Sequence, residues 1–299
     1  MKSPMSRRSA IRKAARYTAA ATAVSPLLSK LARAQEAAPA KLKGNIHQSA
    51  CRWCYKNIKL DDLCAAGKNM GLVAIDLLNP PEFETVKKYG LVCSMVFNPT
   101  VDGLGGIGKA WNRVEHHDKL VPAYEQRLKE TADAGYERLI CFSGNRAGLG
   151  DAQGLDNCEA GLKRILPLAE QLKVTLCMEL LNSKRNHKDY QCDHVAWGAE
   201  LVKRLSSDRF KLLYDIYHMQ IMDGDVCDTI KENHQYFDHY HTGGVPGRAE
   251  IDETQELNWA RIMQAILDTG FKGYVAQEFV PKRPDPLASL RQAVTICDV

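Results

Sequence analysis

The sequence predicts a (β/α)8 barrel that occupies residues 45–299 as a single domain. From residue 45 onward, short apolar runs alternate with amphipathic segments. Strands that are apolar on both faces and alternate with helices form a parallel sheet covered by those helices, and about eight such units in this length fit a barrel. A doubly wound open sheet is the alternative, but the segment after the first predicted strand reads ACRWCYKN and lacks the G-x-G-x-x-G pattern.

Eight strands are predicted from short runs rich in apolar and β-branched residues. They are 45–50 (NIHQSA), 72–78 (LVAIDLL), 91–97 (LVCSMVF), 138–143 (RLICFS), 174–180 (VTLCMEL), 210–215 (FKLLYD), 236–242 (YFDHYHT) and 273–279 (GYVAQEF). Apolar positions three and four residues apart predict helices between them, among others over 120–135, 157–172 and 258–270. Gly90, Gly135 and Gly270 stand where helices are expected to end.

The composition is that of an ordinary globular protein. The chain has 299 residues, of which 45% are hydrophobic and 25% charged, and its formal net charge is +4. This mild charge gives no reason to expect a nucleic-acid partner, and no apolar run predicts a stable membrane span. A small-molecule partner is expected, and a homo-oligomer is compatible with the sequence.

Ten cysteines are present, most of them inside apolar runs, where cysteine usually packs as a small hydrophobic residue. Cys51 and Cys54 have C-x-x-C spacing, but no second such pair completes a zinc site. The pair also follows a predicted strand, whereas a redox C-x-x-C is expected to open a helix. We therefore interpret these two cysteines as structural.

The first 34 residues are typical of a twin-arginine export signal. Arg7 and Arg8 precede a weakly apolar stretch that ends in an A-x-A cleavage pattern over 32–34. Residues 35–44 would then be a short linker, and the mature protein would be periplasmic. A basic tail with no targeting role is the alternative interpretation.

Polar side chains stand at the ends of the last four predicted strands. They are Glu179, Asp215, His241 and Glu278. The carboxyl ends of the strands share one rim of a barrel, and a charged side chain there is costly unless it is paired. Three carboxylates and one imidazole favour a site for Mn²⁺, Mg²⁺ or Co²⁺ over a structural zinc site.

The alternative is that these side chains form salt bridges across the rim with Lys211, Arg248 or Lys282. Because alternate residues of a strand share one face, His239 should point the same way as His241 but lie one pleat deeper. We expect His239 to be buried and to support a ligand from behind.

Several segments resemble the hydroxypyruvate isomerase family, within the larger group of xylose isomerase-like barrels. They are CMELLNSK, YDIYHMQ, HYHTGGVPGR, LNW and GYVAQEFVP. The resemblance implies that Glu179 and Glu278 act as acid and base, that Asp215 and His241 complete the metal site, and that His218 and Arg248 contact the substrate. At position 241 a hydroxypyruvate isomerase would be expected to carry glutamine; histidine is typical of the ketose epimerases and sugar isomerases.

These residues suit a reaction that removes a proton from the carbon next to a carbonyl, passes through an enediolate and returns a proton to the neighbouring carbon. Such a reaction needs a base and a positive centre for the developing oxyanion. The conversion of hydroxypyruvate to tartronate semialdehyde is the expected example. A ketose 3-epimerase or another sugar isomerase is the first alternative. An endonuclease IV-like phosphodiesterase would need more histidines at the strand ends, and a non-catalytic, exported sugar-acid-binding protein would not need both glutamates.

Overall fold

The computed structural model describes residues 41–299, and all structural statements below concern that part of the chain. The predicted export signal and residues 35–40 of the predicted linker lie outside the described residues. Eight parallel strands form one sheet in the order β3-β2-β1-β8-β7-β6-β5-β4. The strands are β1 His47–Cys51, β2 Ala74–Asp76, β3 Val92–Cys93, β4 Arg138–Cys141, β5 Thr175–Glu179, β6 Phe210–Asp215, β7 Phe237–Thr242 and β8 Tyr274–Gln277.

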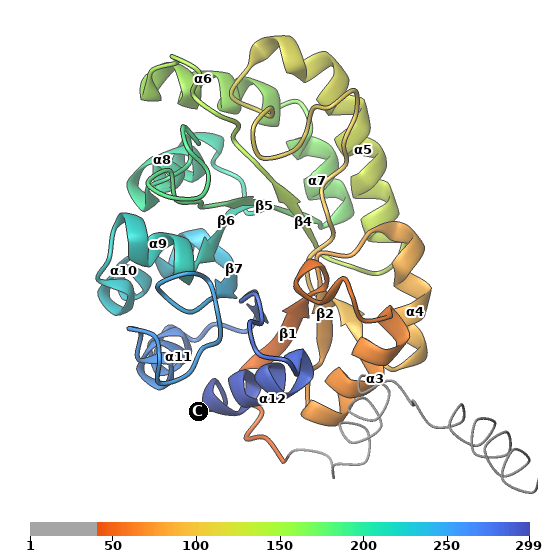
Figure 1. The fold of residues 1–299 in the computed structure, drawn as a ribbon. Helices are drawn as coiled ribbons and strands as arrows, with labels where there is room; N and C mark the ends of the chain where they lie inside the picture. Colours follow the sequence, from red (N-terminus) through yellow and green to blue (C-terminus); the bar gives the residue numbers. More distant parts are fainter. Residues whose placement is uncertain (1–40) are drawn as a thin grey trace, which may run out of the picture. The chain divides into compact units, whose positions relative to one another are not determined.

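The predicted barrel is confirmed. Seven of the eight predicted runs contain one of the strands, the run 45–50 overlaps β1, which extends to Cys51, and helices surround the strands in Figure 1. The sheet is closed between its two end strands by Val96, just after β3, which forms a parallel bridge with Leu139 of β4. The backbone N–H of Ile140 also donates to the carbonyl oxygen of Val96 at 3.1 Å.

The helices follow the strands in alternation. The α-helices are α3 Leu60–Met70, α4 Phe83–Lys88, α5 His117–Asp133, α6 Asp151–Leu162, α7 Leu166–Leu172, α8 Val195–Leu205, α9 Ile216–Met222, α10 Val226–Asn233, α11 Trp259–Asp268 and α12 Pro286–Ile296. The short 3-10 helices are η1 Arg52–Tyr55, η2 Pro80–Glu82, η3 Val114–His116 and η4 His234–Tyr236. None of the described helices is both long and apolar enough to cross a membrane.

Local sequence explains where several helices begin and end. Asp285 accepts a hydrogen bond from the N–H of Ala288 at 3.1 Å and so caps α12. Gly270, just past the end of α11, has φ of 79°, a left-handed conformation that glycine adopts without strain. The single helix predicted over 157–172 is wrong, because α6 ends at Leu162 and α7 begins at Leu166. Pro167 has no N–H to donate and would clash with the preceding turn, so the helix restarts there.

Most of the cysteines are buried, as the sequence predicts. All ten are free, and eight of them are buried. Burial raises the pKa of the thiols of Cys93 and Cys177, which keeps them protonated and unreactive.

Candidate active site

The ends of β5 to β8 bring the four predicted residues together. Glu179 is the last residue of β5, Asp215 is the last of β6, His241 is the last but one of β7, and Glu278 directly follows β8. One potential ligand atom from each lies within 4.8 Å of those of the other three, and all four side chains are buried. Parallel pairing explains the arrangement, since Asp215 is opposite His241 in the register between β6 and β7.

Within this four-residue cluster, His241 lies between the two glutamates. Its Nδ1 is 2.5 Å from Oε2 of Glu278 and 3.6 Å from Oε1 of Glu179. Asp215 approaches from the start of α9, where its carboxylate accepts the N–H of His218 at 3.2 Å and caps the helix. The side chain of Asp215 is thus held by its own helix as well as by the strand.

Burial and the neighbouring charges act differently on the three carboxyls. Burial raises the pKa values of Glu179 and Asp215, because the low-dielectric surroundings disfavour the charged form. Burial also acts on Glu278, but Arg248 and His241 outweigh it and lower the pKa of that carboxyl. For His241 burial lowers the pKa, and the neighbouring Cys51 and Glu278 outweigh it and raise the value. Within the cluster, the surroundings therefore favour the protonated form of Glu179 and Asp215 and the ionised form of Glu278.

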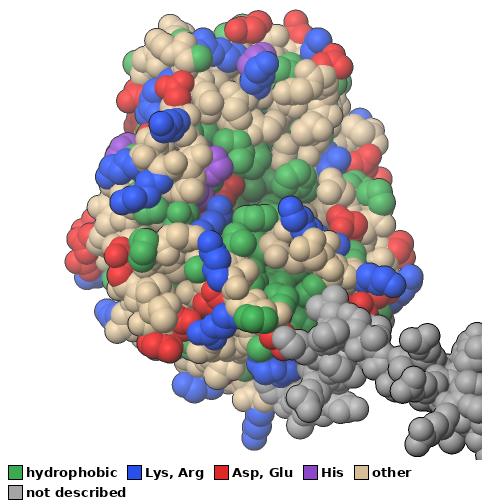
Figure 2. Space-filling model, viewed as in Figure 1, with side chains coloured by type: hydrophobic (Ala, Val, Ile, Leu, Met, Phe, Trp, Pro, Cys, Tyr) green, Lys and Arg blue, Asp and Glu red, His purple; other side chains and the backbone are tan. Residues whose placement is uncertain are grey.

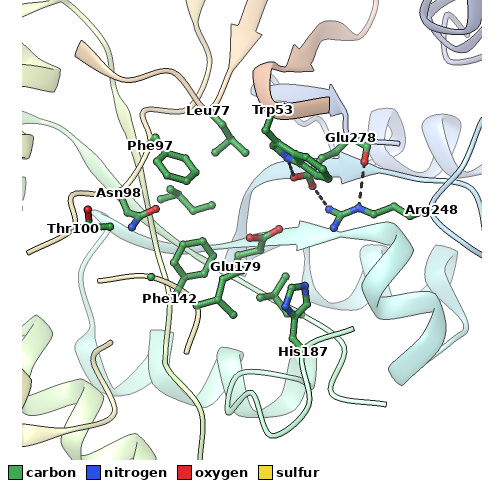
Figure 3. Close-up of a pocket in the computed structure, with 14 residues that line it drawn as sticks. Trp53, Leu77, Phe97, Asn98, Thr100, Phe142, Glu179, His187, Arg248 and Glu278 are labelled. Carbon is green, nitrogen blue, oxygen red and sulfur yellow. Dashed lines mark hydrogen bonds and ion pairs between the residues drawn. The ribbon is translucent and has the colours of Figure 1, made fainter. Parts of the chain in front are cut away.

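Arg248 supplies the only guanidinium that contacts the cluster among the described residues. It donates to both Asp215, at 2.8 Å, and Glu278, as Figure 3 shows for the latter. The predicted alternative of salt bridges across the rim is therefore realised by Arg248, whereas Lys211 donates to the carbonyl oxygen of Gln235. The guanidinium also lies over the rings of Trp53 and Tyr217, 5.4 Å from each centroid.

The donor set fits a divalent cation. If all three carboxylates are ionised, Arg248 and a protonated His241 compensate at most two charges, which leaves at least one negative charge in a buried cluster. A buried, uncompensated charge is unfavourable, and a divalent ion among carboxylate oxygens and one imidazole nitrogen would neutralise it. Glu179, Asp215, His241 and Glu278 are thus residues that could hold such an ion.

Behind His241 lies a second group of polar residues that sequence reasoning missed. Asp76, the last residue of β2, places Oδ1 3.1 Å from Nε2 of His241 and Oδ2 2.9 Å from Nε2 of His239. Burial raises the pKa of Asp76, but the two histidines outweigh it and hold the value far below the usual range. His239 is fully buried one pleat deeper than His241, as predicted.

Cys51, which we interpreted from the sequence as structural, belongs to this group of polar residues behind His241. Its Sγ lies 3.8 Å from Nε2 of His241 and 3.5 Å from Oδ1 of Asp76. Ser94 donates to the other oxygen of Asp76 at 2.5 Å. In the sequence, Asp76 follows an apolar run, as Asp215 does. It was missed because the predicted strand extends to residue 78, whereas β2 ends at Asp76.

His218 is fully buried, and its ring is held by Asn182. Its Nδ1 accepts the backbone N–H of Asn182 at 3.1 Å, and its Nε2 lies 3.6 Å from Oδ2 of Asp215. Burial, helped by Arg248, lowers the pKa of His218, so the ring is neutral. His218 does not line the cavity described next, whereas His187, whose ring centroid is 5.2 Å away, does. The predicted contact of His218 with substrate stays a prediction.

A cavity of about 460 Å³ opens above the cluster. Its charged end is formed by Glu179, His187, Arg248 and Glu278, and Trp53 donates from Nε1 to Oε1 of Glu278 at 2.6 Å. Apolar side chains line the opposite side, as Figure 3 shows, and Figure 2 shows apolar side chains gathered in the hollowed centre of this face. They are Leu77, Phe97, Ile107, Ile140, Phe142 and Leu181. The contact of Trp53 with Glu278 was not predictable from local sequence, because the two residues are 225 positions apart.

The profile of the family described as xylose isomerase-like TIM barrel matches residues 84–295. A human protein provisionally named hydroxypyruvate isomerase is 31% identical over 105 residues, which are 35% of this chain and 38% of that protein. D-psicose 3-epimerase from Ruminiclostridium cellulolyticum is 30% identical over 121 residues, 39% of this chain and 38% of the relative. These matches thus span about two fifths of the length of either relative.

Among solved structures, the AP endonuclease of family 2 from Brucella melitensis has a similar fold. Its TM-score is 0.74 at 22% identity, and the alignment covers 82% of this chain and 97% of that chain. At this identity the likeness concerns the fold alone.

Proposed function

Because the chain belongs to the xylose isomerase-like TIM barrel family, we propose that it is a metal-assisted isomerase of α-hydroxycarbonyl compounds, of the kind that converts hydroxypyruvate to tartronate semialdehyde. The observation that carries the proposal is the convergence of Glu179, Asp215, His241 and Glu278, with ligand atoms within 4.8 Å of one another, beneath a cavity of substrate size. The name of the human relative supports this reaction class.

The two glutamates are the proposed acid and base. Glu179 and Glu278 both line the cavity, so each can reach a bound substrate. One would remove the proton from the carbon next to the carbonyl, which gives an enediolate, and a carboxyl group would return a proton to the neighbouring carbon. The hydroxyl proton would pass from one oxygen of the enediolate to the other, so that the carbonyl group forms at the new position. Their burial excludes bulk water, which would otherwise compete for the proton.

Glu179, Asp215, His241 and Glu278 would hold a Mn²⁺, Mg²⁺ or Co²⁺ ion. When bound, such an ion supplies Lewis-acid stabilisation of negative charge on the substrate oxygens. Asp215 and His241 do not line the cavity and would serve only as ligands. Arg248, which lines it with a side chain that is 14% exposed, would bind an oxygen or a carboxylate of the substrate.

A ketose 3-epimerase is the second candidate, and a specific residue favours it. Position 241 is histidine, as expected for sugar epimerases, and a D-psicose 3-epimerase is among the relatives. Epimerisation uses the same first step, but the proton returns to the same carbon from the opposite face. Two glutamates at the charged end of one cavity suit that reaction as well.

Solvent-deuterium exchange tests both candidates. Hydroxypyruvate and D-fructose would be incubated in D2O with purified, Mn²⁺-loaded protein, and deuterium at the carbon next to the carbonyl would be followed by NMR. We expect exchange in at least one compound, its loss in Glu179→Gln and in Glu278→Gln, and its retention in the control Glu84→Gln, an exposed glutamate of α4. Equal exchange in both active-site variants and the wild type would refute the assignment of the two glutamates.

We also propose that residues 1–34 direct export by the twin-arginine route. The proposal rests on Arg7, Arg8 and the A-x-A pattern alone. Mass spectrometry of the protein from the periplasmic fraction should find an N-terminus at Gln35. A double substitution, Arg7→Lys with Arg8→Lys, should leave the full-length chain in the cytoplasm, and export of that variant would contradict the proposal.

A further inference from the structure

The cavity above the four-residue cluster has two chemically different sides. All charged groups lie at one end, where Glu179, Arg248 and Glu278 meet. The opposite side consists of branched aliphatic and aromatic side chains, and Leu77, Ile140, Phe142 and Leu181 of this apolar wall are at most 7% exposed. An apolar surface of this kind offers no hydrogen bonds to the hydroxyl groups of a small polyhydroxylated acid.

The volume of the cavity also indicates a ligand larger than a three-carbon keto acid. A cavity of about 460 Å³ lies in the range of about 300–1,000 Å³ that holds drug-sized ligands. A three-carbon keto acid bound at the charged end would leave most of this space empty. A free sugar would instead place hydroxyl groups against hydrocarbon, where they lose their hydrogen bonds to water.

Two polar side chains, Asn98 and Thr100, interrupt the apolar wall, and of the two Asn98 is buried. Asn98 lines the cavity, is 3% exposed and donates from Nδ2 to the carbonyl oxygens of Gly105, at 2.9 Å, and Pro99, at 3.3 Å. Both bonds fix the amide so that its Oδ1 remains an acceptor. This Oδ1 is buried and has no hydrogen-bond partner among the described residues. Buried acceptors are normally satisfied, so a ligand that donates a hydrogen bond here would complete the site.

We infer that the substrate is an α-hydroxyketone with an aryl substituent, in which the ring packs on the apolar wall and a ring hydroxyl donates to Oδ1 of Asn98. The hydroxyketone end would lie at Glu179 and Glu278, so this inference rests on the proposed function. Phe97 and Phe142, which project toward the cavity in Figure 3, provide aromatic surfaces for the ring. To the proposed function, the inference adds the chemical class of the part of the substrate that lies away from the hydroxyketone.

The test compares four compounds with the Mn²⁺-loaded full-length protein. They are hydroxypyruvate, D-fructose, a four-carbon hydroxyketone with a terminal phenyl group, and its para-hydroxyphenyl analogue. We expect kcat/KM for deuterium exchange to be at least about tenfold higher for the phenyl compound than for the first two, since burial of a ring contributes strongly to binding. The para-hydroxyl group should add a further factor of about five to ten.

Two variants localise the effect. Phe97→Ala should lower kcat/KM for both aryl compounds, whereas Phe271→Ala, a half-buried phenylalanine outside this cavity that packs on Tyr240, should not. Asn98→Ala should abolish the advantage of the para-hydroxyl group while the phenyl compound keeps its rate relative to D-fructose. Melting temperatures would verify that each variant is folded. If Asn98→Ala does not fold, a para-methoxyphenyl analogue, which cannot donate a hydrogen bond, should lose the advantage of the para-hydroxyl compound with the wild type.

Binding provides a readout that does not depend on turnover. Calorimetry with the phenyl ketone that lacks the reactive hydroxyl should show binding to the wild type and at least about tenfold weaker binding to Phe97→Ala. If hydroxypyruvate or D-fructose exchanges as fast as the aryl compounds, or the aryl ketone does not bind, the inference is wrong while the proposed function stands. If the aryl ketone binds and no compound exchanges, the proposed chemistry is wrong and the aryl pocket remains.

Discussion

Oδ1 of Asp76 lies 3.1 Å from Nε2 of His241, and Oδ2 of the same carboxylate lies 2.9 Å from Nε2 of His239. All three side chains are fully buried. Asp76 contacts Nε2 of His241. The second ring nitrogen, Nδ1, therefore faces Glu278, at 2.5 Å from Oε2. The carboxylate from β2 thus determines which nitrogen of His241 is presented to the four-residue cluster.

Asp76→Asn should weaken metal binding about 10- to 100-fold, the usual effect of removing the partner behind a histidine ligand. Titration of Mn²⁺ into chelator-treated protein by calorimetry measures this change. Asp252→Asn, which alters another buried aspartate away from the cluster, is the matched control and should leave the affinity unchanged. An unaltered affinity in folded Asp76→Asn would show that His241 needs no support from this carboxylate.

Chelation should lower both activity and thermal stability. Removal of a bound divalent ion leaves the three carboxylates of Glu179, Asp215 and Glu278 with only Arg248 and His241, among the described residues, to compensate them. An ion present at about 100 times its Kd stabilises the folded state by about 2.7 kcal/mol. EDTA should therefore lower Tm by several degrees, and Mn²⁺ or Co²⁺ should restore it. An identical Tm with and without EDTA, after metal analysis of both samples, would argue against the metal site.

Arg248→Lys should reduce kcat/KM about 10- to 100-fold although the charge is kept. The guanidinium donates to Asp215, to the carboxylate of Glu278 and, from Nε at 3.2 Å, to the carbonyl oxygen of Glu278. A lysine ammonium cannot reproduce this planar set of donors. Steady-state kinetics would be compared with Arg261→Lys, an exposed arginine of α11, for which no change is expected.

Trp53→Phe should lower kcat/KM about tenfold or more. It removes the 2.6 Å hydrogen bond from Nε1 to Glu278, and a bond to a charged group contributes about 1.5–3 kcal/mol. The ring that lies beside Arg248 is largely kept. Trp259→Phe is the control, because Nε1 of Trp259 has no hydrogen-bond partner among the described residues. Similar kinetics for both variants would mean that the indole contributes only packing.

Glu250 should make stability depend on pH. Burial raises the pKa of this carboxyl, but the backbone N–H groups of Arg283 and Lys282 and the hydroxyl of Ser289 donate to it and lower the pKa below the usual value. A lowered folded-state pKa stabilises the protein above the unfolded pKa of about 4.3, and this stabilisation is lost as the pH falls through the folded pKa.

Glu250→Gln should therefore lower Tm at pH 7, and the difference from the wild type should shrink toward pH 3. Thermal unfolding followed by circular dichroism at both pH values measures it. Glu253→Gln, at an exposed neighbouring position, is the control. A constant difference in Tm across this pH range would show that stabilisation by Glu250 does not depend on its ionised form.

The strands and the four-residue cluster could be predicted because their signals are local. Each apolar run identifies a strand, and the register of a parallel barrel brings the polar residue at each end to one rim. Glu179 and Asp215 therefore needed no knowledge of tertiary contacts. The same holds for His239, whose depth follows from its spacing to His241 along β7.

What could not be predicted depends on contacts between distant segments. Asp76 carries the same local signal as Asp215, but its role is visible only when β2 lies beside β1 and faces the histidines of β7. Trp53 follows β1 and reaches Glu278 after β8, which only the closed sheet brings near. The apolar wall was also hidden, because an apolar residue at a strand end cannot be distinguished in sequence from one in the core.

Closure of the barrel through Val96 has a consequence for how this molecule can change. β3 has two residues, and it pairs with β2 at two positions, whereas each neighbouring pair among β5 to β8 is joined at four positions, with one register shift between β6 and β7 at Leu212/Leu213. Phe97 and Asn98 follow directly after Val96 at that weakly paired edge, while Glu179, Asp215 and His241 belong to the strands with longer ladders. The segment that carries Phe97 and Asn98 can therefore shift with the loss of fewer strand pairs than the strand ends that carry Glu179, Asp215 and His241.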